Sequence, residues 1–230
     1  MKPKSNSILV FKFGGASVKS AKAINNVINI LKLYSNRKIV VVVSAMGKTT
    51  NKLESLFEAA LNEKHDLFIS QKDALYDFHI EMIKTLFSNQ AYETIKHEID
   101  LIFDDISAFY QKQSDHSKSQ RYDAFISFGE HLSSLILQFK IDQDLKESQW
   151  SDARKMIKTD DQFQKANVDW QTSIELIKTH CLEALDAKRI IVTQGFVSSN
   201  ALGETTTLGR EGSDYSAGIF AHALDAESVT

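Results

Sequence analysis

The fold class is decided by residues 8–18, ILVFKFGGASV. The run ILVFKF is apolar except for one lysine and does not alternate, which predicts a strand covered on both faces. The glycine pair that follows allows a tight turn, and a helix is expected to begin near Ser17 or Ser20. A buried strand that turns directly into a helix is the first unit of an α/β fold with a parallel sheet.

Apolar runs elsewhere predict further strands of the same kind. Two are clear and one is weaker: residues 39–44 (IVVVVS), 189–196 (RIIVTQGF) and, less marked, 150–157. Long stretches between them contain neither glycine nor proline, so helices can run through them. Apolar residues recur at helical spacing in several segments: 53–61, 75–86, 95–109, 122–139 and about 171–187. We therefore predict an α/β fold with a mainly parallel sheet and a helix-rich excursion over about 51–145, which a polar surface loop interrupts at 111–120.

Composition excludes several classes of protein. The chain has 230 residues, with 27 basic and 30 acidic side chains and a net charge of −3. It therefore has no excess of positive charge that would attract nucleic acid or anionic lipid. The single Cys181 cannot form an internal disulfide, and its apolar neighbours indicate a core residue. No apolar run is long enough for a membrane span or a signal peptide. We expect a cytoplasmic protein that binds neither nucleic acid nor membrane.

Ligands of open α/β sheets bind beyond the carboxyl ends of the strands, and three marked turns occupy those positions. In the first, Lys12 precedes the pair Gly14-Gly15, whose free amides and nearby positive charge suit a phosphate. In the second, Gly47-Lys48-Thr49 resembles the end of a P-loop. The P-loop motif also needs a glycine at position 42, which is Val42 inside the strand. The ordinary alternative is a helix start capped by Thr49, Thr50 or Asn51, with Glu54 as the capping-box partner.

The third turn is the richest in glycine and polar side chains, from Thr193 to Gly218. Arg210 offers a bidentate fork for a carboxylate, just before an apolar helix. The alternative is an ordinary glycine-rich loop with Asp214 as a helix cap. Gly129-Glu130 lies inside a predicted helix, where most glutamates are solvated. Histidines and the cysteine show no metal-binding spacing, so we expect no protein-built metal site.

Together these segments resemble the aspartate kinases of the amino-acid kinase superfamily. Four ordered blocks carry the resemblance: KFGGASV at 12–18, SAMGKTTN at 44–51, Gly129-Glu130, and QGF to TTLGREGSDYSA at 194–217. The block RxGSDY is what separates aspartate kinases from other kinases of this superfamily. The resemblance implies a three-layer αβα sandwich.

The implied activity is transfer of the γ-phosphate of MgATP to the β-carboxylate of L-aspartate, the first step of lysine, threonine and methionine biosynthesis. The implied cofactors are ATP and Mg²⁺, with magnesium held mostly by ATP oxygens and water. Assembly into a homo-oligomer stays open.

The resemblance also assigns roles to residues. Lys12 and Asp214 would be catalytic, with Lys12 against the transferred phosphoryl group and Asp214 orienting it. Arg210 would bind the α-carboxylate of L-aspartate, and Glu130 its α-ammonium. The remaining implied residues line the amino-acid pocket (Ser44, Thr50, Phe196 and Ser213) or contact the phosphates (Gly14, Gly15 and Ser17).

Two departures from the family pattern matter. Ala16 stands where threonine is usual, which removes one hydroxyl near the phosphates. Residues 1–230 match the N-terminal portion of the family's kinase domain, without the rest of its nucleotide-binding half or the regulatory ACT domains. We therefore expect weak ATP binding and slow turnover from these residues alone. The rival interpretations are a P-loop NTPase built on Gly47-Lys48-Thr49 and an amino-acid-binding regulatory module without kinase activity.

Overall fold

The computed structural model describes residues 7–111 and 115–230. Its elements follow one another in this order: β1 (Ile8–Phe13), η1 (Gly15–Val18), α1 (Ala21–Lys32), β2 (Lys38–Val43), α2 (Thr49–Leu61), α3 (His65–Leu86), α4 (Asn89–Gln111), α5 (Lys118–Ile126), α6 (Phe128–Leu145), β3 (Ser148–Trp150), η2 (Ala153–Lys155), α7 (Trp170–Ala187), β4 (Ile190–Gln194), β5 (Val197–Ser199), β6 (Thr205–Thr207), α8 (Gly212–Ala223) and β7 (Ser228–Val229).

The main sheet has five strands in the order β3-β4-β2-β1-β7, and all neighbouring strands are parallel. The three runs predicted to be buried strands form β1, β2 and β4 at its centre, and the register sets Val43 beside both Phe13 and Gln194. The carboxyl ends of these strands therefore meet at one edge, where the three marked turns follow them.

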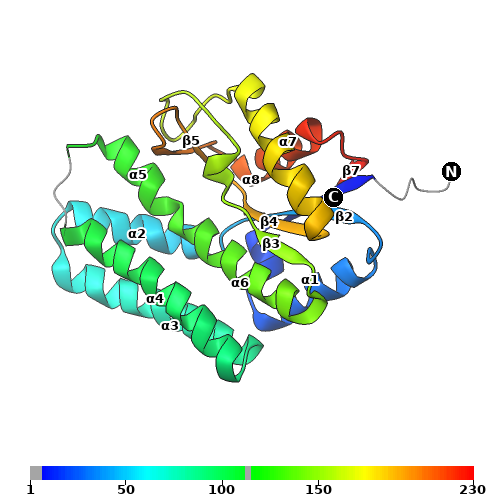
Figure 1. Ribbon diagram of the computed structural model, residues 1–230. Coiled ribbons are helices and arrows are strands. Elements are labelled where there is room, and N and C mark those ends of the chain that lie inside the picture. The colour runs from blue at the N-terminus through cyan, green and yellow to red at the C-terminus, as the bar shows by residue number, and fades with distance from the viewer. Residues whose placement is uncertain (1–6, 112–114) are drawn as a thin grey trace.

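Helices cover both faces of this sheet, which explains why its strands do not alternate. On one face Leu9, Phe11 and Val41 pack with α1 and α6, while on the other Val10, Val40 and Ile191 pack with α7 and α8. Figure 1 shows these two helical layers on opposite sides of the strands. The predicted three-layer α/β fold with a mainly parallel sheet is confirmed.

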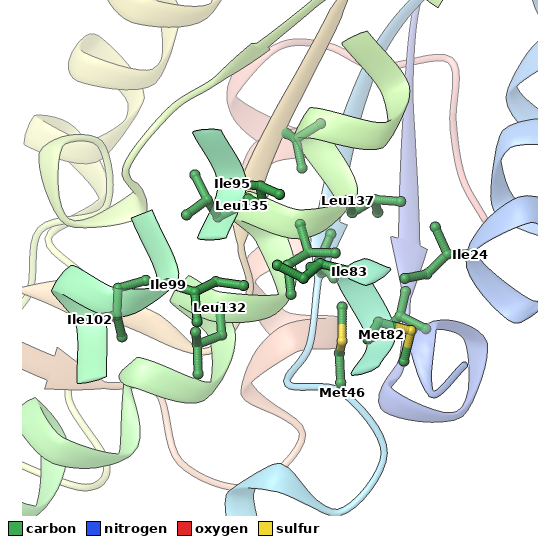
Figure 2. Packing of buried hydrophobic residues seen from close by; sticks show 14 of the residues in the cluster. Ile24, Met46, Met82, Ile83, Ile95, Ile99, Ile102, Leu132, Leu135 and Leu137 are labelled. Atoms are coloured by element: carbon green, nitrogen blue, oxygen red, sulfur yellow. The ribbon is translucent and has the colours of Figure 1, made fainter. Parts of the chain in front are cut away.

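The predicted helix-rich excursion is a helical arm made of α2, α3, α4 and α5, which extends to one side of the sheet before α6 returns to it (Figure 1). Its core is continuous with the core of the sheet. Figure 2 shows Ile24 of α1, Met46 of the loop after β2 and Ile83 of α3 gathered with residues of α4 and α6. Because the arm shares this core, the position of α6 relative to the sheet is fixed by packing.

Some local predictions were wrong. The helix expected over 122–139 is two helices, α5 and α6, because Ser127 ends α5 and its hydroxyl donates to the carbonyl of Ala124. The weak strand expected over 150–157 is β3 at Ser148–Trp150, followed by the short helix η2.

The loop expected at 111–120 is shorter, since α5 begins at Lys118 with a capping box between Ser117 and Gln120. Residues 112–114 of that loop lie outside the described residues. Cys181 is buried among the side chains of the α7 face, and burial raises the pKa of its thiol to about 12, as suits a core residue.

No helix among the residues that the structure describes combines the length and the apolar character that a membrane crossing needs.

Candidate active site

The first two turns touch each other through their backbones. Gly47 donates its N–H to the carbonyl of Gly15 at 2.9 Å, and Gly47 has a φ of +54°. A Cβ on Gly15 would lie 2.6 Å from the carbonyl oxygen of Ala45 and 3.0 Å from that of Gly47. Only glycine permits this approach at position 15, so Gly15 allows the turn after β1 to lie against the turn after β2.

Gly15→Ala is expected to destabilise the protein by about 1–3 kcal/mol, because two backbone segments would have to separate. The matched control is Gly218→Ala on α8, where an added Cβ meets no atom within 4 Å. Removing glycine from a helix there is expected to stabilise by about 0.5–1 kcal/mol. Urea unfolding of both variants measures the two effects, and a Gly15→Ala protein as stable as the wild type would contradict the packing argument.

Lys12 and Asp214 join the first turn to the third. Lys12 is the fifth residue of β1, and its Nζ lies 2.9 Å from the Oδ2 of Asp214 in the first turn of α8. The side chains are 23% and 62% exposed, so the ion pair borders solvent and contributes little to stability. Asp214 is not the cap of α8, because the N-cap residue is Glu211. The pair therefore presents a cation, held by a carboxylate, beside the Gly14-Gly15 turn.

Glu130 is buried rather than solvated, with an exposed fraction of 4%. It lies in the first turn of α6, and its Oε1 accepts a hydrogen bond of 3.1 Å from the N–H of Ala45. Its Oε2 is buried and has no partner among the described residues. Burial raises the pKa of Glu130 to about 8, while the bond from Ala45 opposes that rise. A buried, half-satisfied carboxyl group is suited to receive a cation from a ligand.

The position of Glu130 depends on the glycine before it. A Cβ on Gly129 would lie 3.0 Å from the Cβ of Ala45 and 3.2 Å from a methyl carbon of Leu53. On the same helix, Ser133 donates its hydroxyl to the carbonyl of Ser44 at 2.8 Å. Because α6 lies this close to the turn after β2, Glu130 and Ser44 belong to one site.

The third turn packs against the start of α8. A Cβ on Gly195 would lie 2.6 Å from the Cβ of Ser213, and a Cβ on Gly212 would lie 2.6 Å from the ring of Phe196. Phe196 has a φ of +68°, and its N–H donates to the hydroxyl of Ser216 at 2.9 Å. This backbone conformation is held by α8, so Phe196 and Ser213 are placed together at the carboxyl end of β4.

Other predicted site residues stand near the turns without such contacts. Arg210 is exposed, and no hydrogen bond or ion pair of its side chain occurs within residues 7–111 and 115–230. Ser17 is exposed in η1, and Thr50 is half-buried in the first turn of α2. The guanidinium of Arg210 is therefore open to a ligand. Ser17 and Thr50 lie near the turns, but their contacts do not indicate a role in the site.

The expected cap of α2 was wrong. The N-cap residue is Lys48, which makes no side-chain cap bond, and Glu54 instead accepts from the hydroxyl of Tyr122 at 2.7 Å. The hydroxyl of Thr49 is buried without a partner in the described chain. Glu54 does not complete a capping box because α5 of the helical arm packs beside α2 and places Tyr122 next to the Glu54 carboxylate.

The glycine-rich segment after β4 is also more ordered than a loop. It contains an antiparallel hairpin in which Val197 pairs with Thr207 and Ser199 with Thr205. Sequence reasoning also overlooked Asp123 on α5, a fully buried carboxylate that bonds to Thr207 of this hairpin. The signal available was an acidic residue three positions before the buried Ile126, on the apolar face of the helix.

Among the described residues, no three side chains of histidine, cysteine, aspartate or glutamate gather where they could hold a metal ion.

Comparison with known proteins agrees with this geometry. The family model described as "Amino acid kinase family" matches residues 7–230. The chain belongs to the amino acid kinase family. The chain is 32% identical over 224 residues to lysine-sensitive aspartokinase 3 of Escherichia coli (strain K12), covering 97% of the chain and 48% of the relative. It is 33% identical over 224 residues to an aspartokinase of Chlamydia muridarum, covering 96% of the chain and 46% of the relative.

Solved structures give the same result. The crystal structure of E. coli aspartokinase III in complex with aspartate and ADP superposes on this chain with a TM-score of 0.87 at 32% identity, covering 96% of this chain and 48% of that one. The aspartate kinase of Clostridium acetobutylicum, at 24% identity and a TM-score of 0.73, shares the fold over 97% of this chain and 46% of its own. The chain thus spans about half the length of these relatives.

Proposed function

We propose that this protein acts as an aspartate kinase, which transfers the γ-phosphate of MgATP to the β-carboxylate of L-aspartate. One observation carries the proposal: a buried acceptor on Glu130, the free guanidinium of Arg210 and the ammonium of Lys12 gather around the same three turns. The relative that shares this fold at 32% identity was solved with aspartate and ADP.

Recognition of the amino acid rests on complementary charges. Glu130 pairs with the α-ammonium through its unpartnered Oε2, and Arg210 binds the α-carboxylate with two parallel N–H donors. Ser44, Phe196 and Ser213 enclose the carbon chain between the turns, and Thr50 adds a hydroxyl at the start of α2. This arrangement leaves the β-carboxylate directed toward Lys12.

The chemical step needs positioning and charge stabilisation more than proton transfer. The β-carboxylate is ionised at neutral pH, so an oxygen of it attacks the γ-phosphorus without a general base, and ADP leaves. Lys12, oriented by Asp214, stabilises the charge on the transferred group, while Gly14, Gly15 and Ser17 donate to the phosphate oxygens. Bound Mg²⁺ supplies further charge neutralisation, and oxygens of the nucleotide and water fit its ligand needs better than this chain's side chains do.

Calorimetry with L-aspartate, combined with trapping of the acyl phosphate by hydroxylamine in the presence of MgATP, tests the proposal. We expect saturable binding of L-aspartate and, because residues 1–230 span about half the length of the relatives, slow formation of aspartyl hydroxamate. Binding without hydroxamate would support an amino-acid-binding module instead. No binding of L-aspartate would refute the assignment of the pocket.

Arg210→Lys is expected to weaken L-aspartate binding by about tenfold, because lysine keeps the charge and loses the bidentate fork. The matched control is Arg189→Lys, which alters an arginine paired with Glu147 before the amino end of β4, away from the three turns. The control should bind L-aspartate as the wild type does. Calorimetric dissociation constants for the two variants make the comparison, and equal affinities would argue against a carboxylate on Arg210.

A further inference from the structure

Asp123 is a buried carboxylate. Within the described residues it contacts no cationic side chain and none of the residues proposed to bind L-aspartate. It lies on α5 with no exposed surface. Its Oδ1 accepts from the hydroxyl of Thr207 at 2.8 Å, and its Oδ2 accepts from the N–H groups of Thr207 and Gln164 at 2.9 and 2.8 Å. A carboxylate has about four acceptor sites, and three of them are occupied here by neutral donors, so these bonds anchor Asp123 to both segments.

The two segments that Asp123 holds both lead to Arg210. Thr207 is three residues before Arg210, at the end of β6. Gln164 belongs to a separate segment, yet a Cβ on Gly209, next to Arg210, would lie 3.2 Å from the carbonyl oxygen of Gln164. In addition, Ala166 donates its N–H to the carbonyl of Thr207 at 2.9 Å. One carboxylate therefore fixes the strand before Arg210 and the turn that supports it.

Asp123 also lies close to Glu130 along the chain, seven residues before it. The N–H of Ser127 donates to the carbonyl of Asp123 at 3.2 Å where α5 ends, and α6 begins at the next residue and carries Glu130 in its first turn. The bonds of Asp123 thus join the helix pair that holds Glu130 to the strand that leads to Arg210. These two residues make the opposite charge contacts to an α-amino acid in the function proposed above.

We propose that Asp123 is a positioning residue that sets the spacing between Arg210 and Glu130, and through it the preference for a ligand with both an α-carboxylate and an α-ammonium. The inference rests on the proposed function. It assigns Asp123 no contact with substrate. A change at Asp123 should therefore alter which ligands bind more than whether the chain folds.

The experiment compares two ligands, L-aspartate and its α-amide, which lacks the charge that Arg210 would bind. The wild type should prefer L-aspartate by about 100-fold in calorimetry, as expected for losing a charge-assisted bidentate contact. Asp123→Ala removes both acceptor oxygens and their three hydrogen bonds, and should reduce that preference to below about tenfold. Asp123→Asn keeps an oxygen facing the two N–H groups and an amide facing the hydroxyl of Thr207, so its preference should stay within about threefold of the wild type.

Two further variants separate positioning from loss of stability. Ile177→Ala creates a cavity in the α7 core on the other face of the sheet and should lower the melting temperature without changing the preference between the two ligands. Thr207→Val removes one donor to Asp123 and preserves shape, so it gives a measurable partial loss should Asp123→Ala fail to fold. An unchanged preference in Asp123→Ala, or in Thr207→Val where only that variant folds, would overturn the positioning role. A wild type that does not bind L-aspartate at all would instead refute the proposed function.

Discussion

Lys12→Met is expected to slow phosphoryl transfer by about 10²- to 10³-fold, while the affinity for L-aspartate changes by less than about threefold. The physical reason is that Lys12 stabilises charge that develops on the transferred group, and the amino acid is held by Glu130 and Arg210. Methionine preserves the length of the side chain, and Asp214 is 62% exposed, so water solvates it once its partner is gone. Hydroxamate formation gives the rate, and calorimetry gives the affinity.

Lys48→Met is the matched control for this experiment. Lys48 is an exposed lysine in the Gly47-Lys48-Thr49 sequence, which a P-loop enzyme would use to hold the phosphates. In the structure it caps α2 without a side-chain bond, and Val42 is buried inside β2. We expect Lys48→Met to keep both the rate and the affinity. Loss of transfer in Lys48→Met, with Lys12→Met unaffected, would support the P-loop interpretation.

Glu130→Gln is expected to weaken L-aspartate binding by at least about 100-fold at pH 8, because the amide cannot form an ion pair with the α-ammonium. Its Oε1 can still accept from Ala45, so the helix and the turn after β2 remain in place. The loss should appear in calorimetry as a change in affinity alone. Glu58→Gln on α2, where an exposed glutamate pairs with Lys118, is the matched control and should bind as the wild type does.

The pH dependence of binding provides a second test of Glu130. Its pKa is about 8 without ligand because of burial, so at pH 7 the carboxyl group is mostly protonated. Pairing with an ammonium requires the ionised form, and L-aspartate binding should therefore release a proton. Affinity should rise with pH by up to about tenfold per unit between pH 6 and 8 and then level off. Calorimetry in buffers of different ionisation heat measures the number of protons released on binding. Glu130→Gln should abolish both this release and the dependence of affinity on pH.

The same raised pKa makes Glu130 costly for stability in the absence of ligand. The folded pKa of about 8 lies above the ordinary value of 4.5, so the unfolded chain ionises first, and stability falls as the pH rises from about 4.5 to 8. At about 1.4 kcal/mol per pKa unit, the upper limit of this loss is on the order of 5 kcal/mol. Glu130→Gln removes the titration and should become more stable than the wild type toward pH 8, as urea unfolding at several pH values would show. A parallel pH profile for the two proteins would contradict it.

The sequence predicted secondary structure correctly where the order of apolar residues along the chain reflects both the local conformation and the burial of a segment. The runs at 8–13, 39–44 and 189–196 contain the central strands β1, most of β2 and all of β4, because a strand covered by helices on both faces must be apolar throughout. Gly15 marks a close backbone approach that a Cβ would prevent, and Gly129 marks a position where a Cβ would crowd Ala45 and Leu53. These features indicate the fold and the turns that carry the site, and they require no knowledge of distant contacts.

The signals failed where a distant segment decides the outcome. Glu54 was expected to cap its own helix, yet Tyr122 of α5 provides its partner. Most glutamates in such a helix are solvated, yet the packing of α6 against the turn after β2 buries Glu130 beside Ala45, and burial raises its pKa. In both cases the deciding contact comes from a residue more than sixty positions away, so it cannot be predicted from the local periodicity of the sequence.

The sequence by itself determined the layered α/β fold, the three turns at the carboxyl ends of the strands and the residue types that meet there. Only the tertiary structure decided that Lys12 pairs with Asp214, that one oxygen of Glu130 is left without a partner, and that Asp123 ties α5 to the strand before Arg210. The physical reason is that strand and helix formation follow from the order of apolar residues along the chain. Charge pairing and burial of a carboxyl group depend on which surfaces the completed core brings together.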